Sequence, residues 1–238
     1  VRIKPSNFKT YLLNNLNNGK IEKILIDVKF DEKLNIKDYK VNGSIQKVNI
    51  EVFKDLLIQD VSFNFISDKN LTLINSISAN YQGILISNGS ISLKRNKQIN
   101  IEGEFKSKFN LNEFDINKLF IKSNIKFLEK NKVNTQGTMI HQFVVKIDEN
   151  FKLVDYDYKS SGSISKGQII LNDSFKSSLI KKKIKKLSIQ ETNLEINFNK
   201  KNNNFLKVEG LYNLGKLNNK KFKISYNLNK KKPKYLID

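Results

Sequence analysis

The sequence predicts a mainly β protein: a long antiparallel meander that forms a curved, groove-like sheet, open like a half-pipe. The clearest observation is the stretch from Val133 to Ile147, where most odd positions are apolar and most even positions are polar. A period of two places the two sets on opposite faces of an extended strand. Stretches of the same kind recur along the 238 residues. Hydrophobic residues make up only 39% of the chain, which suits a sheet with one face in solvent.

Composition excludes several kinds of site. The chain has 43 Lys and Arg residues against 23 Asp and Glu, a formal net charge of +20, and no cysteine. The absence of cysteine excludes disulfides, thiolate metal sites and cysteine nucleophiles. Low hydrophobicity with high net charge is also typical of disorder, but the regular alternation of Ile, Phe and Tyr with polar residues favours a folded sheet. A codon bias towards Lys and Asn can explain part of the charge, so the charge alone identifies no partner.

The first expected element is a short helix with its turn, over residues 1–19. Pro5 and Ser6 are helix-start signals, and Asn18 and Gly19 mark the end. The apolar residues between them recur at helical spacing: Phe8, Leu12, Leu13 and Leu16. Such a stripe needs a surface to lie on, so we expect the helix to plug or edge the sheet. The chain begins with Val1 rather than methionine, and we expect it to be a fragment of a longer protein.

Residues 20–228 are predicted to form a single repeating β-groove domain, followed by a charged tail or a continuation of the chain over residues 229–238. The turn signals include Ser67–Asn70 and Asn88-Gly89, and the latter dipeptide is a strong hairpin signal. The strands expected from alternation are Ile24–Phe30, Tyr39–Ile45, Val48–Val52, Val61–Phe65, Leu71–Ile77, Ile84–Ile86, Ile91–Leu93, Ile99–Phe109, Ile121–Phe127, Val133–Ile147, Phe151–Ser160, Ser163–Leu171, Leu187–Phe198, Phe205–Leu214 and Lys220–Leu228.

A basic segment over residues 174–187 is open to three interpretations. Its apolar residues fit one helical stripe: Phe175, Leu179, Ile180, Ile184 and Leu187. Its lysines lie beside that stripe: Lys176, Lys181, Lys182, Lys183, Lys185 and Lys186. A basic amphipathic helix can lie on an anionic membrane surface or contact nucleic-acid phosphates. The third interpretation is a solvated connection between two strands.

No group of residues predicts catalysis. His141 is the only histidine, lies in phase with the apolar positions around it, and has no recognisable Ser or Cys motif beside it. We therefore expect a structural or groove-facing histidine. The carboxylates at Asp155, Asp157, Glu102 and Glu104 are scattered, and no phosphate-binding glycine loop is present. The sequence predicts no enzyme, no metal site and no cofactor.

Several segments resemble a known family in their order along the chain. They are Tyr11-Leu12-Leu13 with Leu16 and Gly19, Tyr39–Gly43 with Val48, Leu57–Val61, Leu71–Ile74, Ala79–Ile84, Gly89-Ser90-Ile91 and Ile101–Phe105. Together they resemble the helix entry and the first strands of the AsmA-like proteins, specifically the large YhdP-type members. The resemblance covers about residues 8 to 110. Tyr11 stands where the family usually has Trp.

This resemblance implies a repeating-β-groove protein of the bacterial cell envelope, similar in architecture to bridge-like lipid transfer proteins. Members of the family are held in the inner membrane by an N-terminal helix, cross the periplasm and are implicated in phospholipid transport to the outer membrane. The chain would then be an internal part that lacks the anchor. Its expected partners are phospholipid or another acyl lipid, the inner membrane through the missing anchor, and an outer-membrane partner.

The groove is expected to be lined by the apolar residues of the alternating strands. They are Ile26, Val28, Phe63, Phe65, Phe105, Met139, Phe143, Val145, Leu194, Ile196 and Phe198. A membrane-surface patch is expected from Lys181, Lys182, Lys183, Lys185 and Lys186. The first alternative is a closed barrel or sandwich with a structural or binding role, in which the same faces are core. The second, less favoured alternative is a basic nucleic-acid-binding module.

Overall fold

The computed structural model describes residues 16–53, 56–113, 115–116, 131–150, 152–177, 180–201, 204–214, 219–227 and 234–237. Within these ranges the protein is all β, and helical residues are confined to 113 and 115–116. The strands are β1 (Leu16–Asn17), β2 (Lys20–Phe30), β3 (Ile36–Phe53), β4 (Leu56–Asp68), β5 (Leu71–Tyr81), β6 (Ile84–Arg95), β7 (Ile99–Leu111), β8 (Lys132–Ile147), β9 (Leu153–Ser177), β10 (Ile180–Asn199), β11 (Phe205–Asn213), β12 (Lys220–Asn227) and β13 (Lys234–Ile237).

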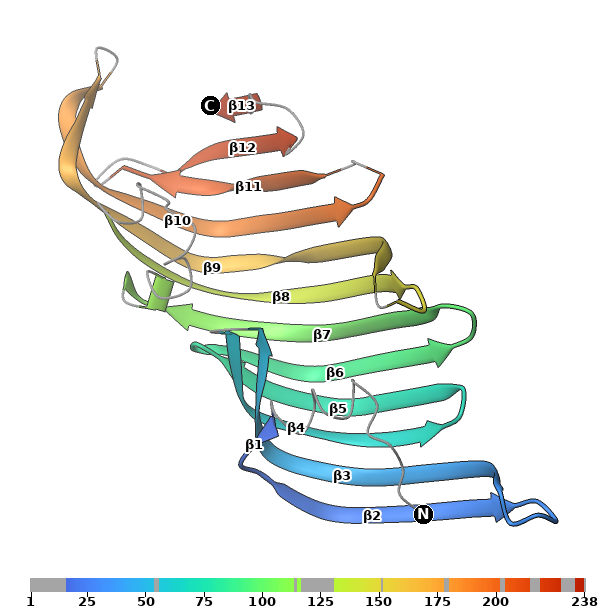
Figure 1. Cartoon of the computed structure of the whole chain (residues 1–238). Coiled ribbons are helices and arrows are strands. Elements are labelled where there is room, and N and C mark those ends of the chain that lie inside the picture. Colours follow the sequence, from blue (N-terminus) through green and yellow to red (C-terminus); the bar gives the residue numbers. More distant parts are fainter. Residues whose placement is uncertain are drawn as a thin grey trace. The chain divides into compact units, whose positions relative to one another are not determined.

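The described strands form one open sheet in which consecutive strands from β2 onward are sheet neighbours. The order runs from β1 through β3, β4 and onward to β13, with β2 paired to β3 off this path (Figure 1). The ladders with a defined register are antiparallel. The predicted antiparallel meander is therefore confirmed. The described strands build neither a closed barrel nor two packed sheets.

The chain divides into two compact units. Unit 1 comprises residues 1–81, 85–105 and 146–152, and unit 2 comprises residues 82–84, 106–145 and 153–238. The strands of unit 1 are β1 to β6 with the first part of β7. Unit 2 holds the rest of β7, nearly all of β8 (up to Val145) and the strands β9 to β13.

Four consecutive strands of unit 1, β3 to β6, each contain a residue with left-handed backbone, and the registers of β3, β4 and β5 shift at or beside it. These residues are Lys47 (φ 52°), Asp60 (φ 53°), Ser76 (φ 56°) and Asn88 (φ 51°). The register between β3 and β4 shifts between Ile45 and Val48, on either side of Lys47. A bulge bends the strand and increases its twist without ending it. For this reason β3 is continuous where the sequence predicted two strands, and β6 likewise runs through its left-handed residue where two strands were predicted.

The buried core of unit 1 lies beside these bulges. Val48 and Val61, which directly follow Lys47 and Asp60, are 4% and 6% exposed and pack with the buried Ala79. The half-buried residues around them are Ile45, Ile50, Ile58, Phe63 and Ile86. Burial in unit 1 is therefore concentrated where the strands bend, and the apolar side chains further along the strands stay partly exposed.

Glycines in unit 2 allow β8 to lie unusually close to both of its neighbours, β7 and β9. A Cβ at Gly162 of β9 would lie 2.7 Å from the Met139 Cα of β8, and a Cβ at Gly137 would lie 2.7 Å from the Phe109 ring. Real Cβ atoms do not approach other atoms so closely. Gly137 interrupts the apolar alternation of β8 because a side chain there has no room.

Two sequence-based predictions about turns have opposite outcomes. The turn at Ser67–Asn70 is confirmed, because the Asp68 carboxylate accepts hydrogen bonds from the backbone N–H groups of Asn70 and Leu71 between β4 and β5. The hairpin at Asn88-Gly89 is wrong, because β6 runs through this dipeptide. Asn88 has its left-handed conformation within the continuous strand instead. The connection from β5 to β6 is Gln82-Gly83, where both residues have positive φ as a type I′ turn requires.

The predicted basic helix over 174–187 is also wrong. β9 extends to Ser177 and β10 begins at Ile180, with Ile184 opposite Phe175. The register shifts between Ile184 and Lys186, and an extra residue in a strand can bring residues three apart onto one face. The three-residue spacing from Ile184 to Leu187 is therefore the same as in one face of a helix, although the segment is a strand.

Some of the predicted elements lie partly or wholly outside the described residues. Most of the expected N-terminal helix (residues 1–15) and the expected strand Ile121–Phe127 lie outside them. Leu16 and Asn17 form β1, which pairs with β3, so these two positions are not helical. At the other end, Lys234–Ile237 forms β13 and pairs with β12, so these four residues continue the sheet.

Candidate functional site

The alternation predicted for β8 is confirmed by its burial pattern. From Lys132 to Val144 each odd residue is buried or half-buried and each even residue is exposed. We call the side of unit 2 that carries Met139, His141, Phe143 and Val145 its apolar face, and the opposite side its polar face.

Strands β9 and β10 contribute to the same apolar face. Tyr158 lies opposite Phe198, Ser160 opposite Ile196 and Gly162 opposite Leu194. Directly paired residues of an antiparallel ladder point to the same side of the sheet. The His141 ring contacts Tyr158 and Ser160, which joins this row to β8. Six predicted groove residues therefore share one face in unit 2: Met139, Phe143, Val145, Leu194, Ile196 and Phe198.

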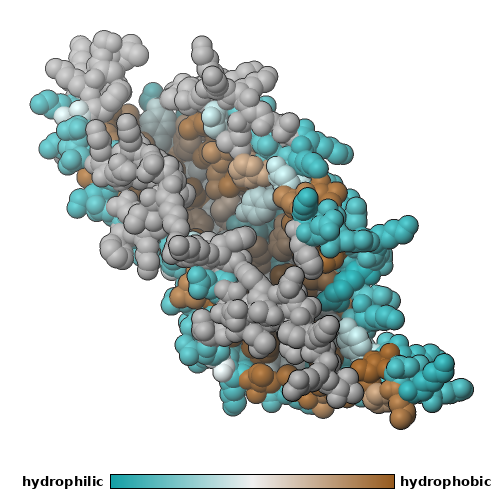
Figure 2. Space-filling view, viewed as in Figure 1, coloured by the Kyte–Doolittle hydropathy of each residue, from teal (hydrophilic) through white to brown (hydrophobic). Residues whose placement is uncertain are grey.

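The apolar face of unit 2 remains accessible. Met139, Phe143, Val145, Leu194 and Ile196 are half-buried, and Phe198 is 40% exposed. In the upper part of Figure 2, over the strands of unit 2, brown apolar side chains gather in a hollow, with teal hydrophilic side chains along its right margin.

Unit 1 has an apolar face of its own, which holds four of the predicted groove residues: Ile26, Val28, Phe63 and Phe65. Gly43 of β3 lies between Ile24 of β2 and Phe65 of β4 in the register, so β2 and β4 present these residues on one side. The rings of Phe63 and Phe65 are 6.2 Å apart. The eleventh predicted residue, Phe105, is half-buried on β7 at the end of unit 1.

A polar cluster interrupts the apolar face of unit 2, and we call it the His141 cluster: Ser107, His141, Tyr158 and Ser160. Nε2 of His141 lies 2.8 Å from the Ser107 Oγ. Nδ1 lies 2.8 Å from the Tyr158 hydroxyl and 3.0 Å from the Ser160 Oγ. Both serines are almost fully buried, at 5% and 4% exposed. Three strands, β7, β8 and β9, thus place hydroxyl groups around one imidazole.

The His141 cluster is electrically neutral near pH 7. Burial lowers the pKa of His141 below its ordinary value of 6.5 because the imidazolium loses hydration. Burial likewise raises the pKa of Tyr158 above its ordinary value of 10.0. The rings of these two residues stack at 6.1 Å, and Phe198 follows Tyr158 at 6.4 Å. The cluster therefore offers hydrogen bonds without charge.

The Ser107–His141 contact has the distance of a nucleophile and its base, but the surroundings suit neutral hydrogen bonding better. In a catalytic triad a buried carboxylate at the other ring nitrogen stabilises the imidazolium. Here Nδ1 faces the hydroxyls of Tyr158 and Ser160. Burial further opposes protonation of the ring. Within the described residues, no group of three His, Cys, Asp or Glu side chains could hold a metal ion.

Charged side chains lie on the polar face of unit 2. Lys207 of β11 pairs with Glu195 of β10 at 3.4 Å, and Lys223 of β12 pairs with Glu209 of β11 at 2.9 Å. The Lys223 ammonium beside Glu209 lowers the pKa of that carboxyl. A pocket of about 660 Å³ opens on the polar face between β8 and β11, with Gln142, Glu195 and Asn197 in its lining. The ion pairs of β10, β11 and β12 therefore lie on the face opposite Leu194 and Ile196.

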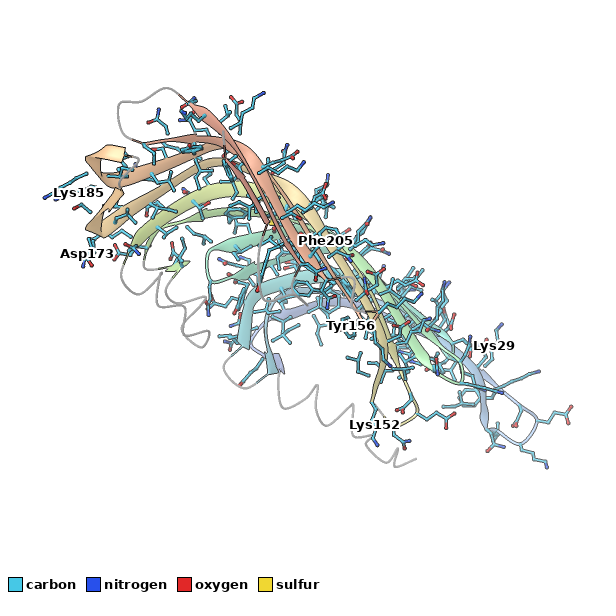
Figure 3. The ribbon with its side chains drawn as sticks, turned by 90° about the horizontal axis from the view of Figure 1, so that it is seen from above. Lys29, Lys152, Tyr156, Asp173, Lys185 and Phe205 are labelled. Carbon is cyan, nitrogen blue, oxygen red and sulfur yellow. The ribbon has the colours of Figure 1, made fainter. Side chains whose placement is uncertain are left out.

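The predicted basic patch lies at one end of the β9–β10 hairpin. Lys183, Lys185 and Lys186 are exposed, whereas the side chains of Lys181 and Lys182 lie outside the description. Figure 3 shows Lys185 on β10 and Asp173 on β9 projecting from this end of the ribbon. Ile184 between the lysines is 8% exposed. No described helix is long and apolar enough to cross a membrane.

Sequence reasoning placed His141 on the apolar face but missed its three hydroxyl partners. Tyr158 and Ser160 lie in phase with Gly162 and Ile164 on β9, which is a recognisable signal. Their approach to His141 depends on the β8–β9 register, which one sequence does not define. Comparison with protein-family models, curated proteins and solved structures gave no match.

Proposed function

We propose that this chain is a segment of a lipid-transfer protein that shields phospholipid acyl chains on its apolar face. The observation that supports this most directly is the accessible row of apolar side chains in unit 2, from Phe143 and Val145 on β8 to Leu194 and Ile196 on β10. In an ordinary core such residues would be covered. Here they stay half-exposed in the described part of the chain.

The physical basis is the affinity of hydrocarbon for hydrocarbon. Each methylene that leaves water for an apolar surface contributes about 0.8 kcal/mol, so an acyl chain is retained by length rather than by one specific contact. A charge on the face would oppose this, and the ion pairs of β10 to β12 lie on the other face. The lipid headgroup can stay in water at the margin of the face.

The cellular setting is part of the same proposal and rests on the resemblance to the AsmA-like proteins. The protein belongs to the bacterial envelope, is periplasmic and is anchored in the inner membrane. It passes lipid to an outer-membrane partner, serves outer-membrane biogenesis and carries out no catalysis.

Native mass spectrometry of the purified chain tests the proposal. Co-purified lipid, released at higher collision energy and identified by mass, should include phospholipid. Val145 and its neighbour Val144 provide a matched pair, because Val145 is half-buried on the apolar face whereas Val144 is 36% exposed on the polar face. Val145→Glu should lose most of the bound lipid, and Val144→Glu should keep it. Equal lipid binding by both variants, or no lipid on the wild-type chain, contradicts the proposal.

A further inference from the structure

The His141 cluster is a polar island on a face that otherwise suits hydrocarbon. Along β8 it lies between Met139 and Phe143, and across β10 the partner of Ser160 is Ile196. Burying hydroxyls in an apolar surface is unfavourable unless they are hydrogen-bonded. The cluster satisfies much of this requirement internally.

The hydrogen count of the cluster leaves a donor for a ligand. A neutral imidazole has one N–H and one acceptor nitrogen. If Nδ1 accepts the Tyr158 hydrogen, Nε2 donates to Ser107 and the Ser107 hydroxyl keeps its own hydrogen. In the other tautomer Ser107 donates to Nε2, and Tyr158 keeps its hydrogen. The Ser160 hydroxyl donates to the Ile140 carbonyl in either case. One hydroxyl hydrogen therefore remains available to an acceptor outside the ring.

The acceptor that fits is uncharged. A phosphate or carboxylate is best bound by cationic side chains, but the nearest described lysine of β9, Lys159, pairs with Asp157 on the polar face. The cluster itself is neutral. A carbonyl oxygen is the acceptor that an acyl ester carries between its chain and its headgroup. The half-buried Tyr158, next to the exposed Phe198, is the member that such a carbonyl can reach from the apolar face.

We propose that the His141 cluster binds the ester carbonyl of an acyl ligand while the apolar residues on either side hold its hydrocarbon. This inference rests on the proposed lipid function and adds the group that is recognised. In the tautomer with the ring hydrogen on Nδ1, His141 donates to the Tyr158 oxygen and so positions the hydroxyl, and the Tyr158 hydrogen is donated to the carbonyl. Ser107 and Ser160 fix the ring. The face thereby distinguishes an ester from plain hydrocarbon and holds an acyl chain at a defined place.

Two probes of equal chain length test this: methyl decanoate, which has the ester carbonyl, and dodecane, which lacks it. Displacement of N-phenyl-1-naphthylamine fluorescence from the purified chain measures the affinity of each. Tyr158→Phe removes one hydroxyl and keeps the ring. His141→Phe keeps an aromatic ring without nitrogen atoms. Tyr156→Phe, two residues earlier in β9 (Figure 3), is the matched control that loses a hydroxyl outside the cluster.

The wild-type chain should prefer methyl decanoate by about 2- to 10-fold, as one neutral hydrogen bond provides. Tyr158→Phe and His141→Phe should abolish this preference and leave dodecane affinity within about twofold, and Tyr156→Phe should retain the preference. If both probes bind equally to the wild type, or if the preference survives both cluster variants, the inference is wrong and the lipid function stands. If neither probe binds to the wild type, both proposals fail.

Discussion

Gly210 of β11 lies directly against Thr192 of β10, so that a Cβ at position 210 would come within 2.7 Å of the Thr192 Cα. Thr192 is fully buried, and its hydroxyl donates to the Gln190 carbonyl at 2.9 Å. Glu191 beside it has left-handed backbone (φ 46°), and the β10–β11 register shifts between Gln190 and Asn193. Thr192 is therefore enclosed at this bulge, and β11 has no room for a side chain at position 210.

Gly210→Ala should lower the free energy of unfolding by about 1–3 kcal/mol, because the added methyl group forces the two backbones apart. Urea unfolding followed by circular dichroism measures the change. Gly167→Ala in β9 is the control, since its Cβ would meet its nearest neighbour, Ile189, at an ordinary 3.4 Å. A Gly210→Ala variant as stable as Gly167→Ala would contradict the close packing.

The bulge at Lys47 makes a separate prediction, which depends on backbone conformation alone. Lys47 is exposed, so its replacement loses no packing. An L-residue pays about 1–2 kcal/mol for left-handed backbone, and a β-branched residue tolerates it least. Lys47 already bears this cost, so Lys47→Ile should lower the free energy of unfolding only by the additional cost of a β-branched side chain, under about 1 kcal/mol, whereas Lys47→Gly should leave it equal or higher. Urea midpoints of the two variants compare them directly, and equal midpoints would show that the strand is extended at this position.

These bulges explain which parts of the fold a single sequence predicts. Alternation identified the apolar side of β8 and the antiparallel order of the sheet, because both follow from local chemistry. The sequence predicted a hairpin at Asn88-Gly89, which lies inside a strand. It predicted a helix from the spacing of Ile184 and Leu187, which also lie in a strand. In each case a left-handed residue or a register shift inside the strand supplies the same local signal, and only pairing with the neighbouring strand distinguishes the two structures.

In the candidate site, too, features of a single strand could be predicted from the sequence, and features that depend on strand pairing could not. The eleven residues predicted to line a groove could be chosen from the sequence because each lies in phase within its own strand. The His141 cluster could not be, because Ser107, His141 and Tyr158 come from three strands and meet only through register. One-residue slips in register move a side chain to the other face, so such a cluster is fixed by the whole ladder rather than by any single segment.

Burial of His141 makes stability depend on pH. Its pKa in the folded protein lies below the unfolded value of 6.5, so the unfolded chain binds the proton more readily. The stabilisation is fully present above about pH 6.5 and is lost as the pH falls towards the folded pKa. His141 is the chain's single histidine. Urea midpoints at about pH 7.5 and about pH 5.5 should therefore differ in the wild type and differ less in His141→Phe. An identical pH dependence in both proteins would show that the ring is solvated.

The basic end of the β9–β10 hairpin should contact anionic membrane. A lysine near such a surface contributes about 1 kcal/mol, so Lys185→Glu with Lys186→Glu should weaken binding to phosphatidylglycerol vesicles by tenfold or more in co-sedimentation at low salt. Lys106→Glu with Lys108→Glu is the matched control, because these exposed lysines of β7 carry the same charge away from the hairpin end. Added salt should reduce wild-type binding, since screening weakens surface charge interactions. Equal losses in the two double variants would assign the binding to overall net charge instead of to this strand end.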